Sequence, residues 1–258
     1  MRIWSIFALA VVFAGSSHRA FALPDELEVH LDETTKKGQF AVDVITNYTA
    51  SGPRVPNTEG LRPTVHLLQI SPDFSYGLTS SSQVGLQLFS SLSPHGDSSV
   101  NGGRIEYLTV PIRPDDDDDG PFLGGLFEVG HLPPTLSKND LDGEIKVLMG
   151  YRGGRWILAA NPEIGFKVTG SGSSKPDLGI KFKAAYRVED SYSVGIEHYG
   201  DMGRIGHIGP LDQQSQQTFA VVDFKARGLD FNVGIGRGWT DFSERWVVKA
   251  IVSFPFGE

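Results

Sequence analysis

Cysteine is absent from the 258-residue chain. This absence excludes disulfide bonds, thiolate metal sites and cysteine nucleophiles together. Long apolar runs are also missing beyond the N-terminus, where no segment holds the about 18 consecutive apolar residues of a membrane helix. Positive charge is in deficit, because 23 Lys and Arg stand against 31 Asp and Glu and give a net charge of −8. We therefore expect no nucleic-acid partner, since general attraction for phosphates needs basic residues.

The composition excludes a bundle of membrane helices but not a membrane β-barrel. Hydrophobic residues make up 40% of the chain. In a barrel only alternate residues face lipid, so the average hydropathy resembles that of a soluble protein. Glycine is abundant, with 31 residues, and glycine suits turns and closely packed strands better than helices.

The first 22 residues have the pattern of a cleavable signal peptide. Met1 and Arg2 provide a positive start, an apolar run covers Ile3 to Gly15, and Ala20-Phe21-Ala22 places small residues three and one before a cut. The alternative is a buried N-terminal helix. We predict an exported protein with a signal peptide at 1–22, an N-terminal periplasmic extension at 23–37 and a β-barrel at 38–258. The acidic part of 23–37 could equally fold into the barrel lumen as a partial plug.

The mature chain alternates with a period of two, which indicates strands. From Asp177 to Val188 (DLGIKFKAAYRV), the apolar residues share one face and both lysines lie on the other. Twelve such segments follow one another, at 38–50, 62–74, 82–93, 103–113, 121–131, 141–151, 155–168, 177–188, 191–200, 216–226, 229–239 and 244–256. Lengths of about ten residues match tilted strands that cross a bilayer.

Short and long connections alternate along the chain. Arg152 to Arg155, Glu189-Asp190 and Arg227-Gly228 are tight turns, and Gly77 to Ser82 and Pro114 to Gly120 are moderate ones. The intervening connections are mostly longer and rich in Gly, Ser, Pro and Asn. Outer-membrane barrels have short periplasmic turns and long outer loops, and an even strand count puts both termini on the periplasmic side. The predicted fold class is all-β, a single antiparallel up-and-down transmembrane barrel of about twelve strands.

Charged residues of both signs occupy the faces opposite the apolar ones. Unpaired ions cannot face lipid or a dry core, so in a barrel they line the lumen, whereas in a soluble sandwich they would face solvent. The predicted lumen-lining residues are Glu144, Lys146, Glu163, Lys167, Lys181, Lys183, Arg187, Glu197, Asp223, Lys225 and Lys249. Aromatic residues near the strand ends fit either interface girdles or ordinary packing in a soluble sandwich.

Two strand–turn–strand segments resemble the periplasmic hairpins of outer-membrane β-barrels. They are Tyr76 to Leu86 (YGLTSSSQVGL) and Tyr186 to Gly200 (YRVEDSYSVGIEHYG). More loosely, these hairpins resemble the outer-membrane transporters associated with phenol and aromatic meta-pathway degradation, and the resemblance covers most of the mature chain as a pattern. The last strand, which ends in Phe254 and Phe256, resembles the aromatic-ended strand read by the barrel-assembly machinery, although Gly257 and Glu258 follow it here. The resemblance implies a channel or uptake protein and brings no site residues with it.

Catalytic and metal motifs are not evident in the sequence. Asp115 to Asp119 lacks the spaced ligands of a calcium loop, so a solvated acidic turn near Arg113 is expected. The seven histidines show neither HxxxH nor HExxH spacing, and no GxSxG elbow occurs. Gly234 to Gly238 lacks the strand-to-helix context of a nucleotide loop. We expect no enzyme activity, no cofactor and no metal.

The sequence thus predicts an outer-membrane channel or uptake protein for small solutes, with hydrophobic or aromatic compounds as a candidate class. Its expected partners are outer-membrane lipid, the barrel-assembly machinery and an unidentified small molecule. Two alternatives stay open, a non-conducting barrel with a structural or surface-interaction role and a soluble periplasmic β-protein.

Overall fold

The computed structural model describes residues 27–53, 63–92, 98–115, 119–132, 137, 139–171 and 175–256. The predicted signal peptide at 1–22 lies outside the described residues. Nearly all of the described chain is strand, and the elements are β1 (Phe40–Ser51), β2 (Leu68–Thr79), β3 (Ser82–Leu92), β4 (Ser98–Ile112), β5 (Gly120–His131), β6 (Asn139–Gly153), β7 (Trp156–Gly170), β8 (Asp177–Glu189), β9 (Tyr192–Arg204), β10 (His207–Ile208), the short 3-10 helix η2 (Leu211–Gln213), β11 (Ser215–Ala226), β12 (Leu229–Gly238) and β13 (Trp246–Phe256).

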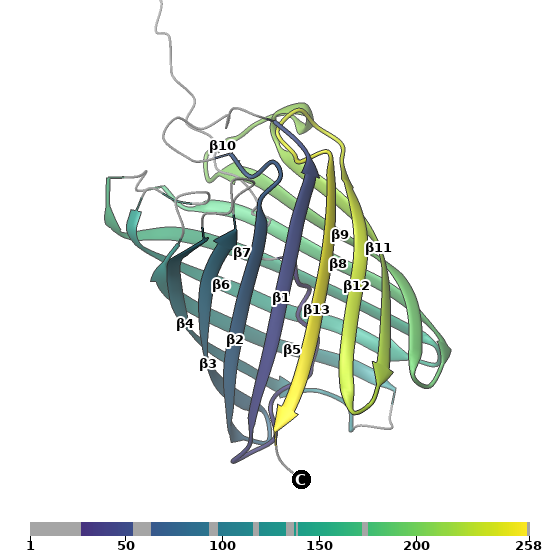
Figure 1. Ribbon diagram of the computed structural model, residues 1–258. Coiled ribbons are helices and arrows are strands. Elements are labelled where there is room, and N and C mark those ends of the chain that lie inside the picture. The colour runs from purple at the N-terminus through teal and green to yellow at the C-terminus, as the bar shows by residue number, and fades with distance from the viewer. Residues whose placement is uncertain are drawn as a thin grey trace, which may run out of the picture.

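The strands form one closed antiparallel barrel (Figure 1). Each long strand pairs with its neighbours in the chain, and β13 closes the barrel on β1 through a register that runs from Phe40 opposite Phe256 to Ser51 opposite Trp246. The two-residue β10 only extends the end of β9, so twelve strands make the wall. The predicted fold class, an all-β up-and-down barrel of about twelve strands, is confirmed. Among the described residues, no helix is long and apolar enough to span a membrane.

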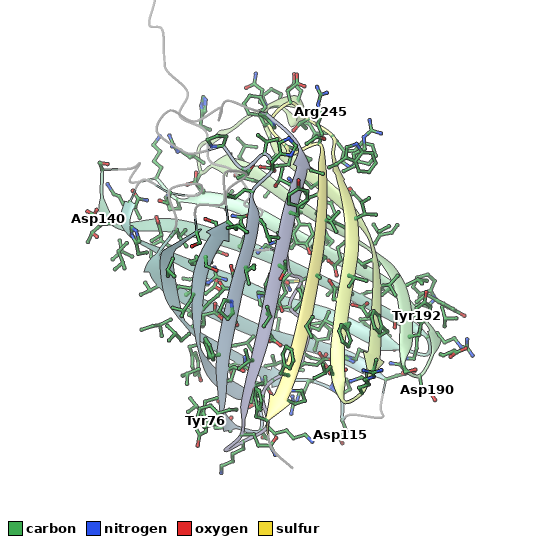
Figure 2. The ribbon with its side chains drawn as sticks, viewed as in Figure 1. Tyr76, Asp115, Asp140, Asp190, Tyr192 and Arg245 are labelled. Carbon is green, nitrogen blue, oxygen red and sulfur yellow. The ribbon has the colours of Figure 1, made fainter. Side chains whose placement is uncertain are left out.

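The tight turns gather at one end of the barrel, together with the seven-residue β4–β5 connection at 113–119, and the other connections lie at the opposite end. In Figure 2, Tyr76, Asp115 and Asp190 mark the end with the short turns, and Asp140 and Arg245 mark the other end. Gly154 and Gly228 have positive φ values of 56° and 77° in the β6–β7 and β11–β12 turns, a backbone region that glycine enters without steric cost. The alternation of connections matches the pattern read from the sequence.

The outward face of the barrel is apolar and exposed. Aromatic pairs gather on it toward the short-turn end, where Phe40 and Tyr76 lie 4.7 Å apart and Trp156 meets Tyr186 edge-on at 5.2 Å between ring centroids. Trp156 and Trp246 are 53% and 44% exposed, which excludes the packing inside a soluble sandwich that the sequence left open. A band of apolar side chains with rings at its borders is what a membrane-facing barrel surface presents.

The second strand lies furthest from its predicted bounds, and the fourth, predicted at 103–113, begins five residues earlier at Ser98. The prediction was 62–74, whereas β2 spans Leu68–Thr79 and turns at Ser80 and Ser81. Gly77 suggested the start of a turn, but it continues the strand. A Cβ atom at Gly77 would collide with the backbone carbonyl oxygens of Thr35 and Lys36, so this glycine is needed for a close approach of another chain segment.

Candidate functional site: the barrel lumen

Charged side chains point inward and are almost inaccessible to solvent. Lys146, Lys249 and Glu197 are each 1% exposed, and Lys183 is 6% exposed. Buried charges are tolerated when they are paired and hydrogen-bonded, and removal of one partner costs about 3–5 kcal/mol. The chemistry of the lumen therefore depends on how these groups pair.

The first ion-pair cluster bridges β4, β5 and β6. Glu106, Glu128 and Glu144 are direct cross-strand neighbours, an arrangement that repels unless cations intervene. Arg104 supplies one cation and lies 2.8 Å from both Glu106 and Glu128. Lys146 supplies the other and lies 2.6 Å from Glu128 and 2.9 Å from Glu144. Arg104 and Lys146 thus alternate with the three glutamates, so each carboxylate of the row has a cation within 2.9 Å.

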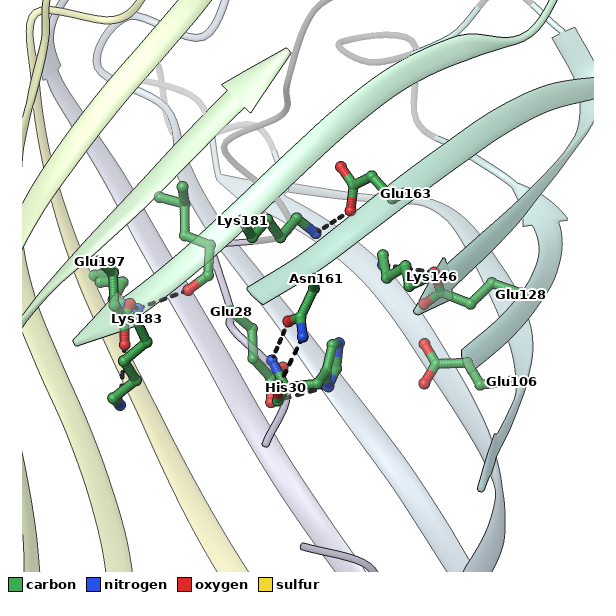
Figure 3. A network of polar contacts seen from close by, with 12 residues as sticks. Glu28, His30, Glu106, Glu128, Lys146, Asn161, Glu163, Lys181, Lys183 and Glu197 are labelled. Atoms are coloured by element: carbon green, nitrogen blue, oxygen red, sulfur yellow. Dashed lines mark hydrogen bonds and ion pairs between the residues drawn. The ribbon is translucent and has the colours of Figure 1, made fainter. Parts of the chain in front are cut away.

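The second ion-pair cluster surrounds Glu197 on β9. Lys183 lies 3.1 Å from one of its oxygens, while Lys249 and the Tyr199 hydroxyl both donate to the other. Lys183 also reaches Asp223 on β11 at 2.7 Å. Figure 3 shows Glu197 and Lys183 on one side of the lumen and Lys146 with Glu128 on the other. Two separate networks therefore hold the charges of opposite walls.

The predicted lumen-lining residues fall into three groups. Lys146 with Glu144, and Lys183 and Lys249 with Glu197 and Asp223, belong to the two clusters. A further pair joins neighbouring strands between them, since Lys181 lies 3.1 Å from Glu163. The remaining three lie toward the strand ends: Lys167 and Arg187 are half-buried, and Lys225 is exposed and pairs with Asp230 at 3.0 Å. The sequence suggested charges opposed across or along the lumen. Most described pairs join the same or adjacent strands, whereas Lys249 on β13 reaches Glu197 on β9 with β11 and β12 between them.

The wall formed by β1, β2 and β3 has a different character. These strands contain no Lys or Arg. Their buried polar residues are mainly amides and hydroxyls, namely Asn47, Thr49, Gln69, Ser71, Ser75 and Gln87. This wall also carries two inward carboxyl groups, Asp43 and Asp73, which lie opposite each other on β1 and β2. The lumen is therefore asymmetric, with a wall of amides, hydroxyls and carboxyls without Lys or Arg facing walls that carry ion pairs.

Residues 27–37, called here the lumen segment, lie inside the barrel. At its inner end, Lys249 Nζ donates a 2.8 Å hydrogen bond to the carbonyl of Leu27. The side chain of Asn161 on β7 then makes two hydrogen bonds to the backbone of His30, accepting from its N–H at 2.8 Å and donating to its carbonyl at 3.0 Å (Figure 3). Asn161 thus imitates the backbone pairing of a neighbouring strand.

Further contacts hold the lumen segment toward the short-turn end. Arg152 donates to Asp32 at 2.6 Å and to Glu33 at 3.0 Å. The Thr35 N–H donates to Gln83, and the Thr35 and Ser75 hydroxyl oxygens lie 2.6 Å apart. The Gly38 N–H then bonds the carbonyl of Gly77 at 2.8 Å, immediately before β1 begins. The contacts come from strands on several sides of the lumen.

Leu27 and Val29 pack against apolar side chains of the lumen wall, and Leu31 packs against the same group. This group is called here the apolar cluster, and its wall members are Leu108, Val110, Phe122, Leu126, Leu148, Ala159, Tyr199, Phe219, Val221 and Val247. Burial of an apolar side chain of this size contributes about 1.5–3 kcal/mol. The lumen segment is therefore held by apolar packing as well as by polar contacts.

The lumen segment carries three titratable groups with shifted pKa values, Glu28, His30 and Glu33. Against the effect of burial, the positive charge of Arg152 and its hydrogen bond lower the pKa of Glu33. Burial, together with the nearby positive charge of Lys146, lowers the pKa of His30 to about 3. Burial raises the pKa of Glu28, against the attraction of Lys249 and Lys146. The His30 ring lies 3.7 Å from the Glu28 carboxylate. His30 is consequently neutral at pH 7, and its backbone rather than its charge holds the segment to Asn161.

Three contact residues escaped the sequence reasoning. Asn161 follows the inward apolar residues Ile157 and Ala159 and is the first polar residue of the inward row of β7, a signal that could have marked it. Arg152 was read only as part of a turn. Arg113, which the sequence showed only as a neighbour of the aspartate run, donates to the Asp32 carbonyl and the Thr34 hydroxyl. Within that run, 116–118 lie outside the described residues, and Asp119 accepts from the Gly154 N–H at 2.8 Å.

Solved outer-membrane barrels share this architecture. The NanC porin matches with a TM-score of 0.57 and 9% identity, covering 84% of this chain and 100% of the porin. An outer-membrane channel from Pseudomonas putida F1 matches with a TM-score of 0.55 and 12% identity, covering 90% of this chain and 100% of that chain. The KdgM porin matches with a TM-score of 0.52 and 10% identity, covering 84% and 99%. At such low identities, the likeness establishes the fold alone.

No family model matches the chain, and no curated protein matches it. The resemblance to transporters of phenol and meta-pathway degradation therefore stays a prediction. The absence of enzyme activity and the partnership with the barrel-assembly machinery also stay predictions. What is established is a closed porin-like barrel with an apolar outer face and a charged, occupied lumen.

Proposed function

We propose that the protein lies in the outer membrane and allows small solutes to cross it through the barrel lumen. The observation that carries the proposal is the segregation of side chains on a closed twelve-stranded wall, with apolar residues outside and ion pairs inside. Lipid on one side and a polar path on the other account for both faces. The similar folds of the NanC and KdgM porins support the same role.

Hydrophobic or aromatic compounds are the solute class that we favour. The apolar cluster forms an inward patch on strands β4 to β7, β9, β11 and β13, next to the ion-paired groups. Ligand sites for such molecules are lined mainly by apolar side chains, with a few polar groups that fix orientation. A path with both kinds of surface suits a molecule that has an apolar body and a polar group.

Reconstitution tests the passage directly. The purified barrel should give single-channel steps in planar bilayers and should speed the entry of small neutral solutes into liposomes. A refolded barrel with its lumen charges reduced, Lys183→Met together with Asp223→Leu, should differ in conductance from the parent protein. If neither protein shows conductance or solute entry, the passage proposal is wrong.

A non-conducting barrel is the second candidate, and a specific observation favours it. Inward residues such as Lys146, Glu197 and Phe219 are at most 1% exposed, so side chains and the lumen segment fill this part of the lumen. Barrels of this size can be filled by side chains and still be stable. The structural role predicts that loop exchanges change partner binding, whereas no lumen variant creates conductance.

A further inference from the structure

The lumen segment joins the wall without becoming part of it. Residues 27–36 belong to no strand, and a single isolated bridge connects Lys37 to Gly77. The other contacts are bonds with wall side chains, together with the packing of Leu27, Val29 and Leu31. Withdrawal of the segment therefore leaves the hydrogen-bond ladders of the twelve long strands intact.

The wall recognises a particular chemistry in the segment. It offers an apolar surface to Leu27 and Val29, and it offers donors to oxygen atoms beside them. Lys249 donates to the Leu27 carbonyl, and the Asn161 amide donates to the His30 carbonyl. Both donors are themselves buried, Lys249 at 1% and Asn161 at 0% exposure. The segment thus acts as an apolar body with accepting oxygens at fixed positions.

We propose that the apolar cluster, with Lys249 and Asn161, is a binding site for a small amphipathic molecule that has an apolar body and an accepting oxygen, and that the lumen segment occupies this site until it is displaced. The inference deepens the proposed function and rests on it for the fate of the bound molecule. Because the lumen segment belongs to the same chain as the site, the free energy needed to displace it lowers the apparent affinity for the solute. Weakening the attachment of the segment should therefore uncover the site.

Because the chain contains no cysteine, a single introduced cysteine carries the only thiol that a thiol reagent can label. Ala159 is small, 6% exposed and part of the apolar cluster, so Ala159→Cys places the thiol in the site. The probe is N-ethylmaleimide, which is neutral and carries accepting carbonyl oxygens. Arg152→Gln removes the attachment to Asp32 and Glu33. Arg155→Gln is the matched control, since Arg155 lies in the same turn and donates to the Val188 carbonyl instead.

We expect N-ethylmaleimide to react with Cys at this position at least tenfold faster in the Arg152→Gln background than in the Arg155→Gln background. For a cationic thiosulfonate of similar size, the labelling rate should increase less between the Arg155→Gln and Arg152→Gln backgrounds. A boiling-dependent gel shift confirms that each barrel is folded, and Asp32→Asn replaces Arg152→Gln if the latter fails this control.

If N-ethylmaleimide labels the introduced cysteine at equal rates in the Arg152→Gln and Arg155→Gln backgrounds, the proposed binding site is wrong, whatever the conductance. An equal gain for the cationic reagent overturns the amphipathic class. Faster maleimide labelling without conductance in any variant upholds the site and removes the passage role, so the two proposals fail separately.

Discussion

At the scale of single residues, Gly77 sets how closely the lumen segment approaches the wall. A Cβ atom there would collide with the carbonyls of Thr35 and Lys36, whereas a Cβ atom at Gly165 on β7 would meet nothing within 4 Å. We expect Gly77→Ala to push the segment away and Gly165→Ala to be neutral. Maleimide labelling of Thr35→Cys should be several-fold faster with Gly77→Ala than with Gly165→Ala, and equal rates would contradict the close approach.

His30 makes the docking of the lumen segment depend on pH. The displaced ring takes up a proton near its ordinary pKa of about 6.5, whereas the docked ring does so only near 3, so acid favours displacement between these values. The effect reaches at most about 1.4 kcal/mol per pH unit. The raised pKa of Glu28 acts in the opposite direction and the lowered pKa of Glu33 acts in the same direction, and both are present in His30→Gln as well. Conductance should rise from pH 7 to pH 5 more in the parent protein than in His30→Gln, and identical pH profiles would refute this role.

At the scale of elements, the lumen segment behaves as a unit tethered at one end. Thr35 and Ser75 have hydroxyl oxygens 2.6 Å apart, so Thr35→Cys with Ser75→Cys can join the segment to β2 close to its tether. Formation of the disulfide should keep residues 27–34 inside the lumen and hold conductance low, and a reductant should reverse the effect. The single-cysteine variants should not respond to reductant. Full conductance in the oxidised double variant would show that the segment does not obstruct the path.

The alternation of side chains defined most elements from the sequence, because burial on one face imposes a period of two. β8, predicted at 177–188, spans Asp177–Glu189. β2 was displaced because Gly77 serves a contact with Thr35 and Lys36 rather than a turn, and such a contact has no local signature. The charged inward positions were also predictable, but Lys183 pairs with both Glu197 and Asp223, and partners follow from register rather than from periodicity. For the same reason, the contact between His30 and Asn161, 131 residues apart, could not be predicted.

At the scale of the whole molecule, the apolar surface lies on the outside. The three described tryptophans, Trp156, Trp239 and Trp246, are 53%, 63% and 44% exposed. In bilayers with brominated acyl chains, we expect their fluorescence to fall strongly relative to ordinary lipid. The folded protein should also migrate differently on gels before and after boiling. Unquenched fluorescence, together with release of the protein by osmotic shock, would instead indicate the soluble periplasmic alternative.

The seam between β1 and β13 closes the barrel. It joins the first strand of the wall to the last, Trp246–Phe256, so the cylinder stays open until these two strands pair. Residues 27–37 directly precede β1 and lie inside the finished cylinder. They need not be threaded through a closed ring, since the seam can close around them. Each newly folded barrel would then already hold residues 27–37 in its lumen. The first displacement of these residues would be a separate event after insertion into the membrane.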